Sequence, residues 1–339
     1  MDSPIKILVV RVGRAGDLVM ITPALNLILE GYPEAEVHLL TSQDGRRTLQ
    51  DYHPRLTRYF LYSRRIPATW WSSPPLLREL RQQNYDRVFL FETNAHYRRL
   101  LAGVAPQMHI VQNLQPDVHY CVRCLEAVET TLTSPWTRGG LTLPVAEAGR
   151  IKAREQLARH GIGDETFLIG LHPTFSGLSH PFFRRGNVKN RSWPQASFAR
   201  LARMIAGYGK TTALEIQIIV DILPGEKKFI EALVRESQGT VTVLSAPPDF
   251  ERYKAVIERM ALLVTPNTGP MHIAAAVGAP VVALFSGSSP LDCGPFVAPD
   301  RCRVLRAEDA ADPAKGLAAI SPEAVFDACL HFLPGSSHP

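Results

Sequence analysis

Apolar, strand-like segments alternate with amphipathic, helix-like segments along almost the whole chain, and this alternation constrains the fold more than any other feature. In the first half, the pattern predicts strands at 5–10, 36–41, 58–62, 86–91 and 108–112, and helices at 17–30, 45–52, 75–83, 95–104 and 117–132. Such alternation is typical of a parallel sheet with helices on both faces. The fold class predicted for this half is therefore α/β with a doubly wound parallel sheet.

The second half of the chain repeats the scheme. Strands are predicted at 167–171, 215–222, 240–244, 261–265 and 280–285, and helices at 193–207, 225–237, 249–259 and 269–277. Because 339 residues exceed the usual size of a single core, we expect two domains, residues 1–158 and 159–339. The final helix, at about 321–333, is a candidate to pack back on the first domain. Two doubly wound halves imply a cleft between them, with ligands bound where the carboxyl ends of the strands face it.

The predicted helix at 193–207 has a clear start signal. Ser192 and Gln195 have the spacing of a capping box, and Pro194 falls in the first turn. We therefore expect the side chain of Ser192 to cap this helix.

Composition narrows the class of protein. The apolar fraction is 45%, yet no apolar stretch reaches the roughly eighteen residues of a membrane span. The N-terminal segment MDSPIKILVV runs straight into a predicted strand, so we expect no signal peptide and a cytoplasmic location. The net charge of +5 suits an anionic ligand, but no nucleic-acid recognition motif or long basic run accompanies it. We therefore expect no nucleic-acid partner.

Five cysteines are an odd number for a disulfide framework. Cys121 and Cys124 form a CxxC motif, which raises the alternatives of a metal or redox site. Their segment keeps the apolar spacing of a helix, and no second CxxC completes a zinc site. We therefore interpret them as core cysteines and expect no bound metal.

The segment ILVVRVGRAGDLVMITPAL, residues 7–25, opens like a nucleotide-binding unit, with a strand, a glycine turn and a helix. Gly13 and Gly16 let the backbone approach a ligand closely, but Asp17 stands where a dinucleotide fingerprint has a third glycine or an alanine. One interpretation is that Asp17 is simply the N-cap of the helix. The other is that its carboxylate deprotonates an incoming hydroxyl group. The residues alone leave both interpretations open.

A second loop has the features of an anion site. In ALLVTPNTGPMHIAAAVGAPVVALF, a buried strand leads through a tight turn into a helix of small residues. Thr268, Gly269 and Met271 are expected to offer backbone N–H groups at the helix N-terminus, where the dipole favours a negative charge. The turn is therefore a predicted diphosphate cradle. His272 follows in the first turn, where a structural role competes with a ligand-binding one.

The segments VGRAGDLVMITPAL and NTGPMHIAAAVGAPVVALF together resemble the ADP-heptose:lipopolysaccharide heptosyltransferase family, glycosyltransferase family 9. The usual motifs of that family read GD-x5-P-A-L and D-[TS]-G-P-x-H-x-A-A-A. The resemblance extends over most of the chain and includes RSWP at 191–194 and PGE at 224–226. It implies a GT-B fold, in which two Rossmann-like domains with doubly wound parallel sheets face each other across a cleft.

The resemblance also implies an activity. Family members transfer a heptose or related sugar, with inversion and without a metal, from an ADP-sugar to a lipopolysaccharide-core or similar glycolipid acceptor. The donor would bind mainly to the second domain and the acceptor to the first. The ADP-sugar is a substrate, so no resident cofactor is implied, and the sequence has no Asp-x-Asp motif. A glycolipid acceptor implies peripheral contact with the cytoplasmic face of the inner membrane. The oligomeric state stays open.

Residue by residue, the resemblance implies a role for each matching position. Asp17 corresponds to the general base, and Arg191 takes the place of a lysine whose charge offsets the leaving diphosphate. Glu226 matches an acid that holds the ribose hydroxyls. The full set of implied donor-binding residues is Thr174, Glu226, Asn267, Thr268, Gly269, Pro270, Met271 and His272. Candidates on the acceptor side or in the basic loop at 174–191 are Gly13, Gly16, Arg184, Arg185 and Lys189.

Two departures from the family pattern keep alternatives open. Asn267 replaces the family's acid before Thr-Gly-Pro, so the donor sugar could differ, or the protein could bind a donor without turnover. The basic loop at 174–191 is longer than expected, and it is a lid, a contact for a phosphorylated acceptor or a surface insertion.

Other functions compete with heptosyl transfer. A transferase of the same family with another donor or acceptor is one, and a sugar-nucleotide isomerase or hydrolase on the same scaffold is another. A nicotinamide dehydrogenase is disfavoured, because the first turn lacks G-x-G-x-x-G.

Overall fold

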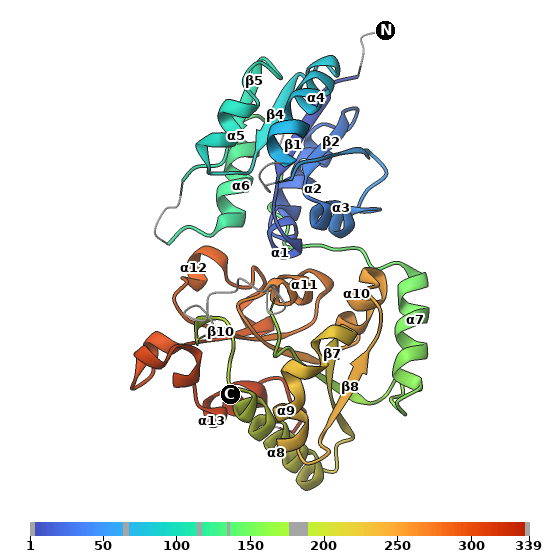
Figure 1. Ribbon diagram of the computed structural model, residues 1–339, viewed down its shortest axis with the longest axis vertical. Coiled ribbons are helices and arrows are strands. Elements are labelled where there is room, and N and C mark those ends of the chain that lie inside the picture. The colour runs from blue at the N-terminus through green and yellow to red at the C-terminus, as the bar shows by residue number, and fades with distance from the viewer. Residues whose placement is uncertain (1–3, 64–67, 114–116, 134–135, 176–188, 336–339) are drawn as a thin grey trace. The chain divides into compact units, whose positions relative to one another are not determined.

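The computed structural model describes residues 4–63, 68–113, 117–133, 136–175 and 189–335. The chain divides into two compact units, Met1–Leu143 and Pro144–Pro339. Each unit is built on a parallel sheet with helices on both faces (Figure 1). The predicted doubly wound α/β class is therefore confirmed.

The sheet of the first unit has parallel strands in the order β3-β2-β1-β4-β5. The strands are β1 (Lys6–Arg11), β2 (Glu36–Thr41), β3 (Leu56–Leu61), β4 (Arg87–Leu90) and β5 (Gln107–Ile110). The helices are α1 (Ala15–Val19), α2 (Thr22–Gly31), α3 (Gln43–Leu49), α4 (Ala68–Gln82), α5 (Ala95–Leu100) and α6 (Tyr120–Glu129). Because the chain winds outward from β1 in one direction and from β4 in the other, the strand order reverses between these two strands.

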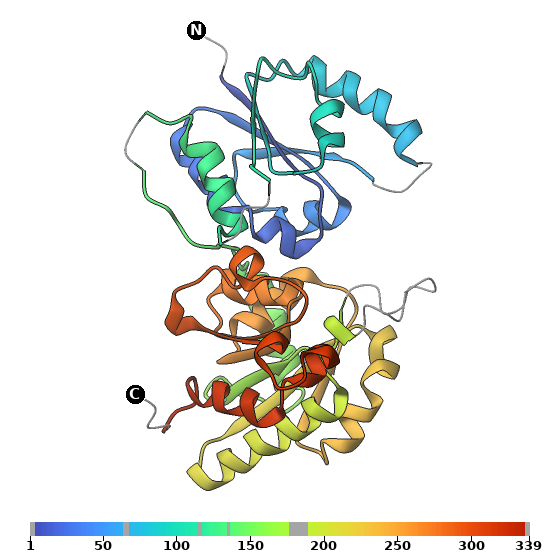
Figure 2. The same cartoon turned by 90° about the vertical axis from the view of Figure 1, so that its left-hand side faces the viewer.

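Both faces of this sheet are covered by helices. Figure 2 shows α2 and α6 on one face and α4 and α5 on the other. Leu8 and Val10 of β1 belong to the core cluster under α4 and α5, together with Leu80. Coverage on both sides explains the unbroken apolar run of β1, in which every residue from Ile7 to Val10 is 0% exposed.

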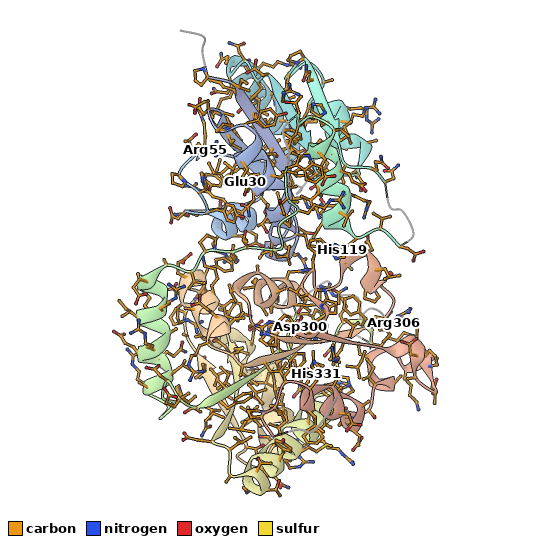
Figure 3. The ribbon with its side chains drawn as sticks, turned by 180° about the vertical axis from the view of Figure 1, so that it is seen from behind. Glu30, Arg55, His119, Asp300, Arg306 and His331 are labelled. Carbon is orange, nitrogen blue, oxygen red and sulfur yellow. The ribbon has the colours of Figure 1, made fainter. Side chains whose placement is uncertain are left out.

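The helix predicted at 17–30 is two helices, α1 and α2, which corrects the prediction. Pro23 at the start of α2 cannot donate a backbone hydrogen bond, and the hydroxyl of Thr22 donates to the carbonyl of Val19 at 2.8 Å. At the other end of α2, the guanidinium of Arg55 (Figure 3) donates to the last carbonyls of the helix and of the turn that follows. Both ends of α2 are thus defined by side chains.

The sheet of the second unit has parallel strands in the order β11-β10-β9-β6-β7-β8. The strands are β6 (Phe167–Leu171), β7 (Ile216–Ile222), β8 (Val241–Ser245), β9 (Leu262–Pro266), β10 (Val281–Phe285) and β11 (Cys302–Arg306). The α-helices are α7 (Glu147–Ala158), α8 (Gln195–Thr212), α9 (Glu231–Glu236), α10 (Phe250–Glu258), α11 (Gly269–Val277), α12 (Pro290–Cys293) and α13 (Pro322–Leu330). Short 3₁₀ segments are η2 (Pro224–Ile230), η3 (Pro299–Arg301), η4 (Ala307–Asp309) and η5 (Pro313–Ala319). Here the strand order reverses between β6 and β9.

Helix α7 belongs to the second unit, so the expected boundary between residues 158 and 159 differs from the one in the structure. α7 packs directly on α10: a Cβ atom at Gly149 would lie 2.7 Å from the carbonyl oxygen of Glu251. The guanidinium of Arg150 also pairs with Glu258 of α10 at 2.7 Å. These contacts hold α7 against its own unit, and the first unit ends at Leu143.

Helix α13 also packs within the second unit, against α8 and β10. Its residues Val325 and Cys329 are 0% exposed and belong to the core cluster of this unit, which also contains Phe198 of α8. The apolar face of α13 is therefore covered within its own unit, and packing of the final helix on the first half stays a prediction.

Two local predictions in the second half are also corrected. Helix α8 begins at Gln195 with Pro194 as its N-cap, so Ser192 does not cap it. The side chain of Gln195 instead binds backbone groups near α9, accepting from the N–H of Leu233 at 3.0 Å. Strand β11 was not predicted at all, because it is a partly exposed edge strand with arginines in place of an apolar run. Figure 3 marks its surroundings by Asp300 before it and Arg306 at its end.

The cysteines of the CxxC motif are core residues, as predicted. Cys121 and Cys124 are buried in α6 and form no disulfide bond within the described residues, and burial raises the pKa of the Cys124 thiol to about 12. Of the remaining cysteines, Cys329 is buried, whereas Cys293 and Cys302 are partly exposed. Within the described ranges, no three His, Cys, Asp or Glu side chains gather in a way that could hold a metal ion. No helix in the same ranges is long and apolar enough to cross a bilayer.

Candidate functional site

The first candidate site lies at the carboxyl ends of β1 and β4, where the strand order of the first sheet reverses. Open α/β sheets bind ligands at such a point. The turn of Val12, Gly13 and Arg14 leaves β1 here, and Glu92 follows the neighbouring β4. The N–H of Val12 donates to the carboxylate of Glu92 at 2.7 Å, so the two strand ends are tied together.

Asp17 lies in the first turn of α1, with 35% of its side chain exposed. One carboxylate oxygen accepts from the backbone N–H of Arg14 (2.8 Å), and the other accepts from the guanidinium of Arg11 (2.7 Å). Arg14 is therefore the N-cap residue, which corrects the interpretation of Asp17 as the N-cap. The carboxylate is fixed by two donors and still reaches solvent, so it can accept a proton from a bound molecule.

Arg11 is mostly buried between two acids. Besides its bond to Asp17, the guanidinium lies 3.5 Å from the carboxylate of Glu92 and donates to the carbonyl of Phe91 at 3.1 Å. Its central carbon lies 4.8 Å from the centre of the Tyr120 ring, on α6. Burial by itself lowers the pKa of Arg11, but Tyr120, Asp17 and Glu92 outweigh it and raise the pKa above its ordinary value. Arg11 is thus a fixed positive charge.

The two predicted glycines of this turn have different roles. A Cβ atom at Gly13 would lie 2.4 Å from the Cβ of Asp17 and 2.6 Å from one of its carboxylate oxygens, so the residue has to be glycine. The carbonyl of Gly13 also accepts from the hydroxyl of Ser42, the N-cap of α3. Gly16 is buried inside α1. The close backbone approach at Gly13 is therefore to Asp17 itself.

The second candidate site lies at the carboxyl ends of β6 and β9, the corresponding reversal in the second sheet. Leu171 of β6 pairs with Val264 of β9, so the segments after the two strands leave the sheet side by side. Thr174 follows β6, and Asn267 follows β9, directly before Thr268, the N-cap of α11. The sheet therefore brings the predicted donor residues of both segments to one edge.

The anion cradle at the start of α11 is narrower than predicted. The backbone N–H of Met271 donates to the carbonyl of Thr268 at 3.1 Å, and Pro270 has no N–H to offer. The N–H groups of Thr268 and Gly269 remain for an anion, since neither donates to another backbone carbonyl within the part of the chain that the structure describes. The side chains of Met271 (0% exposed) and His272 (4%) lie in the core of the unit, which favours a structural role for the histidine.

The side chains of Asn267 and Thr268 are oriented by neighbours. The hydroxyl of Thr268 donates to the carbonyl of Pro266 (3.2 Å) and lies 3.1 Å from the hydroxyl of Thr265, which closes the turn. The amide nitrogen of Asn267 donates to the sulfur of Cys293, on α12, at 3.5 Å. A neutral amide and a thiol thus stand together where the family motif has an acid.

Arg191 is brought to the end of β6 by an aromatic contact. Its guanidinium carbon lies 5.1 Å from the centre of the Phe175 ring. Phe175 is buried and directly follows Thr174, which is buried as well. Beside them, burial lowers the pKa of His172 to about 4, so its ring is neutral near pH 7. Arg191 therefore supplies positive charge at the edge where Thr174 lies.

Of the other residues predicted to bind the donor or to lie in the basic loop, those that the structure describes make contacts away from the start of α11. Glu226 lies in η2 after β7, the neighbour of β6, and its carboxylate accepts from the N–H of Leu223 at 3.0 Å. That bond is what an ordinary acid at the start of a helical turn makes. The ammonium of Lys189 donates to a carbonyl of η5 at 3.3 Å. Arg184 and Arg185, with most of the basic loop, lie outside the described residues.

Arg11 and Glu92, which form the charged surroundings of Asp17, were not predicted from the sequence. Each follows an apolar run: ILVVR ends in Arg11, and VFLFE ends in Glu92. A charged residue at the carboxyl end of a buried parallel strand is the signal that could have found them. Their pairing depends on β1 and β4 being neighbours, which no local pattern predicts.

Sequence comparison relates both units to known transferases. Residues 182–316 match the family described as "Glycosyltransferase family 9 (heptosyltransferase)". Lipopolysaccharide heptosyltransferase 3 of Escherichia coli (strain K12) is 23% identical over 295 residues, which cover 80% of this chain and 80% of that protein. The similarity therefore extends well beyond the segment that matches the family.

Solved structures share the fold. The glycosyltransferase family 9 protein from Veillonella parvula has a TM-score of 0.79 at 20% identity, covering 98% of both chains. The E. coli heptosyltransferase WaaC with ADP has a TM-score of 0.69 at 18% identity, covering 97% of this chain and 100% of that chain. These likenesses confirm the predicted GT-B fold class.

Proposed function

The chain belongs to glycosyltransferase family 9 and is a glycosyltransferase, and from this premise we propose that it is an inverting, metal-independent enzyme with an ADP-sugar donor. We propose heptose as the transferred sugar and a lipopolysaccharide-core or similar glycolipid as the acceptor. The name of the E. coli relative, lipopolysaccharide heptosyltransferase 3, supports both choices. The structural neighbour WaaC with ADP supports the nucleotide.

The observation that carries this proposal is the opposite chemistry of the two strand-order reversals. At the first, Asp17 presents a carboxylate that two donors hold and that reaches solvent. At the second, the start of α11 and the guanidinium of Arg191 supply positive charge. A carboxylate repels a diphosphate but accepts a proton, whereas the second edge favours an anion. Group transfer from a nucleotide diphosphate to a hydroxyl group needs both.

In the proposed reaction, Asp17 takes the proton of the acceptor hydroxyl. The acceptor oxygen attacks the anomeric carbon of the sugar from the face opposite the diphosphate. The bond between that carbon and the diphosphate oxygen breaks, and its electron pair leaves with ADP. One glycosidic bond forms as one phosphoester-type bond is lost, and the configuration at the anomeric carbon inverts. General-base catalysis of this kind contributes about 10²–10⁴-fold.

Stabilisation of the leaving ADP is assigned to the second unit. The N–H groups of Thr268 and Gly269 and the charge of Arg191 would offset the negative charge that builds on the diphosphate, which is usually the largest catalytic term. Thr174 would contact a phosphate, and Glu226 would hold the ribose hydroxyls. In that role Glu226 would exchange its bond to the N–H of Leu223 for the ligand.

We place this activity in the cytoplasm, with peripheral contact to the inner membrane where a glycolipid acceptor resides. The net charge of +5 favours an anionic surface.

Nucleotide release from a panel of ADP-, UDP-, GDP- and dTDP-sugars, with and without core glycolipid, tests the proposed function. We expect ADP release from ADP-heptose only when the glycolipid is present. Release from another nucleotide-sugar would be consistent with the proposed mechanism but would identify a different donor substrate. Release without any acceptor would indicate a hydrolase or isomerase, and binding without release would contradict an active transferase. Asp17→Asn is expected to abolish sugar transfer without affecting donor binding. Nucleotide release by this variant therefore measures the background for each donor.

A further inference from the structure

The proposed base is paired with an arginine, and that pairing opposes its function. A guanidinium at hydrogen-bond distance stabilises the charged form of a carboxylate, and so weakens the carboxylate as a proton acceptor. The guanidinium of Arg11 lies 2.7 Å from Asp17. If Arg11 paired with Asp17 and with no other acid, the carboxylate of Asp17 would be a poor base near neutral pH.

Arg11 is shared with a second carboxylate. Its other terminal nitrogen lies 3.5 Å from one oxygen of Glu92, whose side chain is only 7% exposed. The second oxygen of Glu92 accepts from the N–H of Val12 at 2.7 Å, so this carboxylate cannot turn away. Since charges interact strongly when they are shielded from water, Glu92 compensates part of the positive charge that Asp17 experiences.

The guanidinium is also held from the remaining directions. It donates to the carbonyl of Phe91 at 3.1 Å and lies against the ring of Tyr120, 4.8 Å from its centre. The ring is itself fixed, because its hydroxyl donates to the same carbonyl of Phe91 at 2.5 Å. Arg11 therefore cannot move to follow Asp17.

Helix α6 brings further titratable groups against this cluster, and they are neutral or otherwise engaged. Burial raises the pKa of Tyr120 well above its usual value and that of Cys124 to about 12, so neither is charged near pH 7. The guanidinium of Arg123 donates to the carbonyl of Gln112 at 3.0 Å and lies 5.3 Å from the centre of the Tyr120 ring. Among the groups on the β1–β4 side, Glu92 thus carries the negative charge that opposes Arg11.

The charged groups on the other side of Asp17 are more exposed. Arg14 precedes α1, and α3, which packs on α1, carries Asp44, Arg46 and Arg47. Asp44 and Arg47 pair with each other at 2.9 Å. Water and salt screen exposed charges of this kind far more than buried ones. The buried pair of Arg11 and Glu92 is therefore the stronger influence on the carboxylate.

We propose that Glu92, acting through Arg11, sets the proton affinity of Asp17 and keeps it basic enough to take the proton of the acceptor hydroxyl. Glu92 is then a positioning residue, because it touches the arginine and not the substrate. The inference rests on the proposed function, in which Asp17 is the base and the proton moves from the acceptor oxygen to its carboxylate. Without the charge of Glu92, Arg11 would pair with Asp17 alone and weaken it.

The pH dependence of kcat/KM in the full-length protein, with ADP-heptose and core glycolipid, tests this inference, because its acidic limb reports the base of the free enzyme. Glu92→Gln removes the charge but keeps an oxygen that can accept from the N–H of Val12. In the profile of Glu92→Gln, we expect the acidic limb to move to lower pH by about half a pH unit. The maximal kcat/KM should also be lower than in the wild type. Arg11→Gln removes the opposing charge, so its limb should move to higher pH by about one pH unit. A merely structural role would lower the rate at every pH without moving the limb.

The matched control is Glu79→Gln, which breaks another glutamate–arginine pair of the same unit, Glu79 with Arg58 at 2.6 Å. We expect its acidic limb to stay in place. An unmoved limb in Glu92→Gln, in an enzyme that Asp17→Asn inactivates, would overturn this inference and leave the proposed function intact. Full turnover in Asp17→Asn would instead overturn the role of Asp17 and this inference with it. If Arg11→Gln does not fold, Glu92→Gln decides alone.

Discussion

The turns after β1 and after β9 each lie beside the reversal of strand order in their sheet, yet they suit opposite charges. Each follows a buried strand beside the reversal of strand order, and each leads into a helix. After β1, the first helical turn presents the carboxylate of Asp17. After β9, it presents the N–H groups of Thr268 and Gly269.

The difference shows how one side chain changes the chemistry of a common scaffold. The start of a helix favours a negative charge in either unit. In the first unit the chain supplies that charge itself, because Asp17 accepts from the N–H of Arg14. In the second unit a threonine and a glycine leave the position for a ligand. The same backbone feature thus yields a proton acceptor in one unit and an anion cradle in the other.

The largest effect is expected from Asp17→Asn, which removes the built-in charge of the first turn. Turnover should fall by about 10²–10⁴-fold, because asparagine cannot take the proton of the acceptor. Nucleotide binding should stay unchanged, because the proposed donor residues belong to the second unit. Initial rates and an ADP titration by calorimetry measure the two properties separately.

Asp86→Asn is the matched control for that substitution. Asp86 also accepts from a backbone N–H, that of Lys6 at 2.8 Å, but at the amino end of β1. Its replacement should leave turnover near the wild-type value. A loss of ADP affinity in Asp17→Asn, or equal losses of turnover in both variants, would contradict the separate roles of the two turns.

A second prediction concerns the positive charge at the turns of the second unit. Arg191→Gln should lower kcat/KM by about 10²-fold and weaken ADP binding, because the leaving diphosphate loses a compensating charge. Arg191→Lys should lose less, since it keeps the charge and loses only the planar guanidinium that stacks on Phe175. Steady-state kinetics with varied donor concentration measure both variants.

The control for Arg191 is Arg200→Gln, which removes an arginine of α8 that pairs with Glu323. This pair is solvent-exposed, so its loss should change neither kinetics nor ADP affinity noticeably. If Arg191→Gln behaved like Arg200→Gln, the cationic character of the second site would rest on the helix terminus alone.

Much of the fold could be predicted because its signals are local. Buried parallel strands such as β1 and β9 are continuous apolar runs, and glycine or proline turns separate them from the helices. β11 was not predicted, because an edge strand is partly exposed and does not require a continuous apolar run. The assignment of α7 to the second unit was not predicted, because its packing on α10 joins segments that are far apart in the sequence.

The candidate site could be predicted only in part, for the same reason. Asp17 and Thr268 stand in turns whose residue pattern is itself informative. Arg11 and Glu92 can pair only because β1 and β4 are neighbouring strands, and the sequence does not indicate that pairing. The narrowing of the cradle by the N–H of Met271 is a hydrogen-bond detail that residue types do not specify.

The smallest effect is expected from Asn267→Asp, which brings a carboxylate into the second turn and so makes it more like the first. A hydrogen bond to a charged acceptor contributes about 1.5–3 kcal/mol, compared with about 0.5–1.5 kcal/mol for one to a neutral amide, so a carboxylate holds a sugar hydroxyl more strongly by about 1 kcal/mol. Partly offset by repulsion from the diphosphate, this should raise kcat/KM for ADP-heptose relative to ADP-glucose by about threefold. Aspartate also cannot donate to Cys293 as Asn267 does. Cys293→Ala removes that contact without adding charge. If it changed the donor ratio as much as Asn267→Asp, the orientation of residue 267, and not its charge, would select the sugar.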